Sequence, residues 1–237
     1  MPAATRTATT TMTTTTTEAA LLRLLTWLSP AFPTGGYAYS HGLEWAVEQR
    51  EIVDGASLQA WLDAILRHGA GRSDAILLRH AHRAAHDADA LAGIAELACA
   101  IAPSRERLGE AVGQGNAFVA AAAAWRPEVL IRLAAQVGDI AYPVAVGALA
   151  RTSAIPEDGA CLAYLQGFTA NLVSAAVRLV PLGQSAGLAV LALLEPTIIA
   201  VAEASRGVPL DDLGTACFRA DLAAMHHETQ YTRLFRS

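Results

Sequence analysis

The sequence CLAYLQGFTANLVSAAVRLV at residues 161–180 is followed almost at once by GQSAGLAVLALLEPTIIAVAEA at residues 183–204. Both stretches favour helices, and both are apolar around most of the helix circumference. Helices of this kind are typical of the centre of a helical protein, where other helices enclose them. The pair therefore predicts an all-α fold, a single-domain bundle of about ten helices around two buried central helices.

The composition also favours one helical domain. Of the 237 residues, 53% are hydrophobic and only 6% are aromatic. Alanine and leucine supply much of the apolar content, and both are strong helix formers. We therefore predict an all-helical domain over residues 18–237. Residues 1–17 are rich in threonine and poor in large apolar side chains, so we expect a disordered tail there.

Neither a membrane span nor an oxidising compartment is expected. The longest uncharged run, Leu179–Leu194, is shorter than the roughly 20 residues that cross a bilayer. The three cysteines are odd in number, far apart and without Cys-x-x-Cys spacing (Cys99, Cys161 and Cys217). Reduced thiols in a cytoplasmic protein fit this pattern better than disulfides or a zinc site.

The charged residues exclude several classes of function. The formal net charge is −5, and the basic residues are scattered rather than gathered in a stripe, so nucleic acid is not an expected partner. All 17 basic residues are arginines. Without lysine the chain cannot supply a phosphate-loop lysine, a Schiff base or a Ser-x-x-Lys nucleophile.

A shaped corner is predicted near the beginning of the helical domain, in SPAFPTGGYAYSHGLE at residues 29–44. Two prolines and a glycine pair interrupt regular structure between two apolar helical runs. We expect Gly36 to need a positive φ, and a helix to begin near Tyr37. The alternative is a capping turn whose aromatic side chains simply fill the core.

The carboxy terminus is the second unusual segment. Phe218, Leu222 and Met225 predict one apolar stripe of a helix, and the chain then continues as YTRLFRS at residues 231–237. Terminal residues are usually polar and frayed, so aromatic side chains and arginines here indicate a segment that docks on a partner. The alternative is a tail that folds back onto its own core.

Two further patterns, one catalytic and one metal-binding, give weaker evidence of function than the two unusual segments above. Gly183-Gln184-Ser185-Ala186-Gly187 matches the nucleophile elbow of α/β-hydrolases, and Asp211 and His226 follow in the right order for a serine hydrolase. The elbow needs a preceding strand, which the alanine-rich surroundings do not predict.

His82 and His86 have the spacing of a metal-binding pair. Arg79, Arg83 and Asp87 instead suggest a solvated helix face, and no metal site is assigned.

Three blocks carry a family resemblance when they are taken together. They are residues 29–44, the sequence RLVPLGQ at residues 178–184, and the pattern of His226, Glu228, Tyr231, Arg233, Leu234, Phe235 and Ser237. In this order they closely resemble the urease accessory protein UreF family, over residues 20–237.

The resemblance implies a nickel-urease maturation factor that is not itself an enzyme. Members of this family dimerise, bind the accessory protein UreD (also called UreH) and through it recruit the GTPase UreG. The assembly acts on apo-urease to carbamylate its active-site lysine and install nickel. On this reading the chain holds no cofactor of its own, because partners handle nickel and GTP.

The resemblance also assigns candidate partner-binding residues at the two unusual ends of the domain. They are Gly35, Gly36, Tyr37, Tyr39, Ser40 and Glu44 at the corner, Arg178, and His226, Glu228, Tyr231, Arg233, Leu234 and Phe235 near the carboxy terminus.

Overall fold

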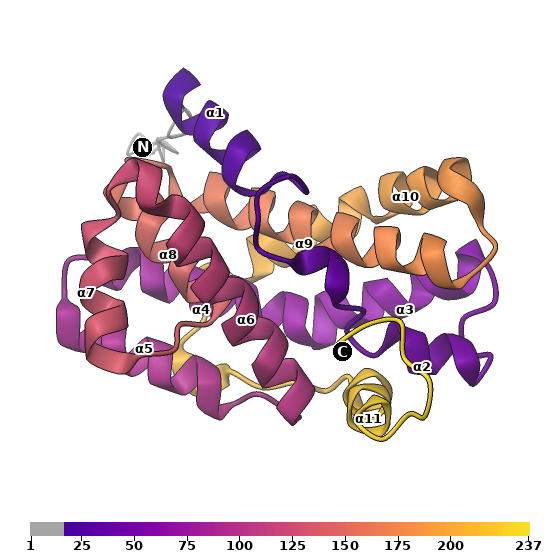
Figure 1. Cartoon of the computed structure of the whole chain (residues 1–237). Coiled ribbons are helices and arrows are strands. Elements are labelled where there is room, and N and C mark those ends of the chain that lie inside the picture. Colours follow the sequence, from indigo (N-terminus) through magenta and orange to yellow (C-terminus); the bar gives the residue numbers. More distant parts are fainter. Residues whose placement is uncertain (1–16) are drawn as a thin grey trace, which may run out of the picture.

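The computed structural model describes residues 17–237, so residues 1–16 of the tail predicted at residues 1–17 lie outside the described part. All regular elements in residues 17–237 are helical (Figure 1). The α-helices are α1 (Glu18–Trp27), α2 (Leu43–Glu48), α3 (Gly55–His68), α4 (Ala70–Ala84), α5 (Ala88–Ala100), α6 (Arg105–Ala121), α7 (Glu128–Val137), α8 (Tyr142–Thr152), α9 (Glu157–Leu179), α10 (Gly183–Ala204) and α11 (Phe218–His227). Three short 3₁₀ helices join them: η1 (Gly36–Ala38), η2 (Ala122–Trp125) and η3 (Leu210–Asp212). The all-α prediction is confirmed.

Side chains at the helix starts explain where several helices begin. Asp54 caps α3 and forms a capping box with Ser57, while Asp87 and Ser104 cap α5 and α6. Each of these side chains accepts a backbone N–H that has no partner inside the helix. Pro143 lies in the first turn of α8, where a missing N–H costs nothing.

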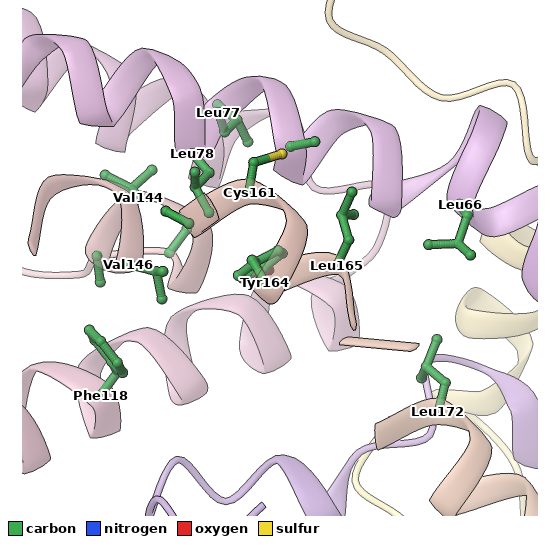
Figure 2. Packing of buried hydrophobic residues seen from close by; sticks show 14 of the residues in the cluster. Leu66, Leu77, Leu78, Phe118, Val144, Val146, Cys161, Tyr164, Leu165 and Leu172 are labelled. Carbon is green, nitrogen blue, oxygen red and sulfur yellow. The ribbon is translucent and has the colours of Figure 1, made fainter. Parts of the chain in front are cut away.

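The centre of the protein is the crossing of α4 and α8, covered by α9. Every residue from Pro143 to Ala150 of α8 is buried. Gly147 lets the two backbones touch, because a Cβ built there would lie 2.2 Å from the carbonyl oxygen of Leu78. Figure 2 shows Leu77 and Leu78 from α4 facing the side chains of Cys161 and Tyr164 from α9.

The prediction of two buried central helices is only partly correct for α9 and is wrong for α10. Helix α9 buries one long face, but α10 packs against α3, α4 and α9 on one side only. On its other side Leu188, Leu193 and Ile199 are 66%, 59% and 50% exposed. Apolar content alone does not tell a buried helix from one with an uncovered apolar face.

The lengths of α9 and α10 and their apolar composition would allow either to cross a membrane. About half of the apolar window of α9 and 39% of that of α10 are buried inside the protein. Burial against other helices accounts for the apolar character of α9, and the outer face of α10 remains uncovered.

A candidate docking site where the two ends of the domain meet

The glycine corner is a compact turn with three left-handed backbone positions before α2, at Gly35, His41 and Gly42. Gly35 has a φ of 73° directly before η1, and Gly42 has a φ of 78° directly before α2. The expectation that Gly36 needs a positive φ is wrong, since that conformation belongs to Gly35. Gly36 is instead restricted by space, because a Cβ there would lie 3.2 Å from Oε1 of Gln114 and 3.4 Å from Oδ1 of Asn171.

Helix α9 fixes the corner from one side. Asn171 donates its side-chain N–H to the carbonyl oxygen of Gly36 at 3.0 Å, and Arg178 donates to that of Tyr37 at 2.8 Å. The corner carbonyls thus accept from two side chains seven residues, or about two turns, apart on α9. The Tyr37 ring itself is 73% exposed.

The carboxy-terminal segment folds back onto this corner. Of the two possibilities considered from the sequence, this is the tail that folds back onto its own core. The amide of Arg236 donates to the carbonyl of Ala38 at 2.8 Å, and both the amide and the hydroxyl of Ser40 donate to the carbonyl oxygen of Ser237. Phe235 is buried, with the guanidinium of Arg178 4.4 Å from its ring centre. In Figure 1 the carboxy terminus accordingly lies between the corner and α11.

Glu44, in the first turn of α2, anchors the folded-back segment. One carboxylate oxygen accepts the amide of Leu234 at 2.7 Å, and the other accepts the amide of Phe235 at 2.9 Å and faces Nε2 of His227 at 3.1 Å. Glu44 is buried, so these partners replace the water that a carboxylate needs.

The amino-terminal end of α6 supplies the second anchor. Glu106 accepts from Arg233 at 2.8 Å with one oxygen and faces Nδ1 of His227 at 2.7 Å with the other. Glu228 accepts the free amides of Arg105 and Glu106, so it caps α6 from the far end of the chain. Acidic side chains are stabilised at this positive end of the helix dipole.

A further buried group extends the network into the core. Glu110 is hydrogen-bonded to Arg107 and to the hydroxyl of Ser237, and it lies 3.3 Å from Nδ1 of His41. Burial alone would raise the pKa of Glu110, but Arg107 and His41 hold it well below its usual range. Burial, assisted by Arg107, lowers the pKa of His41.

A cavity of about 160 Å³ lies between the corner, α6 and α9. Asp74, Tyr142 and Tyr164 contribute to its lining. Tyr164 donates to Asp74 at 2.7 Å, and burial raises the pKa of Asp74 to about 6. Within residues 17–237 no three histidine, cysteine or acidic side chains are grouped as metal ligands.

Comparison with known proteins identifies the family. The UreF family model matches residues 52–195. A urease accessory protein UreF from Rhodopseudomonas palustris (strain TIE-1) is 52% identical over 224 residues, covering 93% of both chains. Its counterparts from Bradyrhizobium sp. (strain ORS 278) and Methylobacterium sp. (strain 4-46) are each 51% identical, covering 92% and 91% of this chain and 92% and 88% of their own.

The chain belongs to the UreF family of urease accessory proteins.

Members of the UreF family are named for an accessory role and not for a reaction, which agrees with the prediction that this chain is not an enzyme. The serine-hydrolase alternative fails on geometry. Ser185 is exposed in the first turn of α10, and no strand precedes it in the described residues. His226 stacks on the ring of Trp45 at 5.0 Å, in a different part of the structure from Asp211 in η3.

The solvated face predicted around His82 and His86 is correct for Arg83 and Asp87, which are exposed, and wrong for Arg79 and His82, which are buried. Arg79 is 1% exposed, and it donates to Ser205, Glu157 and the carbonyl of Ala202. His82 is buried, with Nε2 2.9 Å from the carbonyl oxygen of Ile155. A buried arginine is tolerated here because its planar fork finds enough acceptors.

Most of the sequence-predicted site residues come together in this one network. His226 stands apart on the outer side of α11, and Tyr231 and Leu234 point into solvent at 104% and 77% exposure. The sequence reasoning missed the central partners of the network, His227, Glu106 and Glu110. The adjacent pair His226-His227 and the i, i+4 spacing of Glu106 and Glu110 were the available signals.

Proposed function

We propose that the chain is a cytoplasmic scaffold that bridges UreD (UreH) and the GTPase UreG, works as a homodimer, and thereby delivers nickel to apo-urease. In this role it binds no cofactor, because the metal and the nucleotide stay with the partners. Membership of the urease accessory family supports the general role.

The observation that carries the proposal is the exposure of large side chains on a fixed backbone. Tyr37, Tyr231 and Leu234 all point outward, while the segments that hold them are tied to α2, α6 and α9 by hydrogen bonds. Exposed aromatic residues on a backbone that is already ordered lose little entropy on binding, which is the usual property of interface anchors.

Copurification with tagged UreD tests the proposal. The double variant Tyr231→Ala and Leu234→Ala should keep the melting temperature of the unchanged chain, because neither side chain is buried, but at least tenfold less of it should remain bound to UreD. The matched control is Ile131→Ala on α7, which removes a 59% exposed apolar side chain elsewhere. Equal retention of the double variant and the control would refute this docking role.

A second measurement addresses assembly. Light scattering after size exclusion should give twice the mass of one chain for the chain alone, or a mass that contains two copies of the chain for its complex with UreD. UreG should be retained only when UreD is present. A strictly monomeric chain in both samples would contradict the homodimer.

A further inference from the structure

His227 occupies an unusual position between two carboxylates. It lies at the end of α11 with its side chain fully buried, and each ring nitrogen faces a different acidic side chain. Nδ1 is 2.7 Å from Glu106 and Nε2 is 3.1 Å from Glu44.

This geometry requires an additional proton. An ionised carboxylate can only accept hydrogen bonds, and a neutral imidazole has one N–H and one lone pair. With both glutamates ionised and the ring neutral, one carboxylate oxygen would face a lone pair at hydrogen-bonding distance. One more proton within the group formed by Glu44, Glu106 and His227 removes this repulsion.

The charge balance points the same way. Arg233, on the second oxygen of Glu106, contributes one positive charge. With the extra proton the charges of the two glutamates, Arg233 and His227 sum to zero, and without it they sum to −1. An uncompensated buried charge is unfavourable.

The same two carboxylates hold the carboxy-terminal segment. Glu44 binds the amides of Leu234 and Phe235, and Glu106 binds the guanidinium of Arg233. If either carboxylate moves away from an unprotonated ring, it also leaves its partners on residues 233–235. Protonation and docking of the segment are therefore linked.

The other charged groups nearby are already engaged. On α6, Arg107 pairs with Glu110, and Arg105 lies beside Glu228. Behind the ring on α11, His226 stacks against Trp45 of α2. Glu44 and Glu106 are thus the acidic side chains that face His227, and Arg233 is the positive group that faces them.

We propose that the proton held between His227, Glu44 and Glu106 is a latch that keeps residues 231–237 docked, and that its loss as the pH rises releases them. The latch is a property of this chain alone. Its consequence for partner binding rests on the proposed function, since release would remove Tyr231 and Leu234 from their fixed positions.

Hydrogen exchange of the isolated full-length chain, followed from pH 6 to pH 9, tests the latch without any partner. The protection factors of the Leu234 and Phe235 amides, corrected for the intrinsic pH dependence of exchange, should fall at least tenfold. Those of α8 should stay constant. Protection of Leu234 and Phe235 that does not change with pH would overturn the proposal.

Glu106→Gln distinguishes a protonation latch from general loosening. A glutamine amide can donate to Nδ1 of a neutral imidazole and still accept from Arg233, so no extra proton is required. In this variant the segment should stay protected across the pH range, while His226→Gln, the control, should keep the full pH dependence. A fall in Glu106→Gln equal to that of the unchanged chain would also overturn the latch.

Nitrogen NMR of the His227 ring in the unchanged chain provides a measurement independent of any variant. At pH 6 it should show protons on both nitrogens or a hydrogen bond from a protonated glutamate. Failure of the UreD experiment with a pH-dependent segment would reject the proposed function and leave the latch intact.

Discussion

Gly35 and Gly42 have nearly the same left-handed backbone but different surroundings. A Cβ on Gly35 would meet no atom within 4 Å, whereas one on Gly42 would lie 2.8 Å from the backbone nitrogen of Ala224 in α11. The first glycine serves the turn alone. The second also allows α11 to approach the beginning of α2.

This difference gives a paired prediction. Gly35→Ala should lower the free energy of unfolding by about 1–2 kcal/mol, which is the cost of a left-handed non-glycine residue. Gly42→Ala should lower it by about 2–5 kcal/mol, because overpacking against a backbone atom is added. Urea titration of both variants measures the two costs, and equal losses would mean that α11 does not pack where it is described.

Asp74 gives a pH-dependent prediction. Its pKa is raised from 3.8 to about 6 in the folded protein, so the charged form is penalised by burial above pH 6, and the penalty disappears as the pH falls towards 4. Asp74→Asn removes this penalty and retains an acceptor for Tyr164. The stability of the variant minus that of the unchanged chain should therefore rise by about 2 kcal/mol from pH 4 to pH 7. Urea titrations at both pH values measure it, and a constant difference would argue against the raised pKa.

At the scale of helices, α10 shows what the apolar pattern does and does not determine. The sequence predicts the bounds Gly183–Ala204 correctly. It does not predict how many neighbours the helix has, because a face left for another molecule has the same composition as a face buried in the core. The predicted stripe of Phe218, Leu222 and Met225 on α11 also faces outward, and the inner face of that helix carries Ala220, Ala223 and Ala224.

Adjacent leucines on α10 test its orientation. Leu194 is fully buried and Leu193 is 59% exposed. Leu194→Ala should lower the free energy of unfolding by about 2–5 kcal/mol, whereas Leu193→Ala should change it by less than about 0.5 kcal/mol. Thermal melts of the two variants compare these losses of stability directly. A larger loss for Leu193→Ala than for Leu194→Ala would mean that Leu193, and not Leu194, faces the core.

At the scale of the whole molecule, one hydrophobic core joins α1 to α11. Composition was sufficient to predict this, because helix formers fill the chain and strand formers are few. The network at the corner could not be predicted, since it depends on pairing residues near 44 with residues near 234. The local sequence pattern does not show which distant segments contact each other. Only the resemblance to the UreF family assigned most of these residues together as candidate partner-binding residues.

A single core predicts a single unfolding transition. The four tryptophans lie in different elements, namely Trp27 in α1, Trp45 in α2, Trp61 in α3 and Trp125 in η2. Their fluorescence and the far-UV circular dichroism should therefore report the same melting temperature. Two separated transitions would show that part of the helical domain unfolds independently.

The backward fold of the carboxy-terminal segment also affects how the protein matures during translation. Glu44 and the amide of Leu234 are 190 residues apart. At about 5–20 residues per second, a ribosome needs roughly 10–40 s to add that length. For this time the corner and α2 exist without the residues that satisfy the Glu44 carboxylate. The nascent chain therefore completes this region only when residues 227–235 emerge, and a synthesis stalled before residue 234 leaves the Glu44 carboxylate without the amides of Leu234 and Phe235.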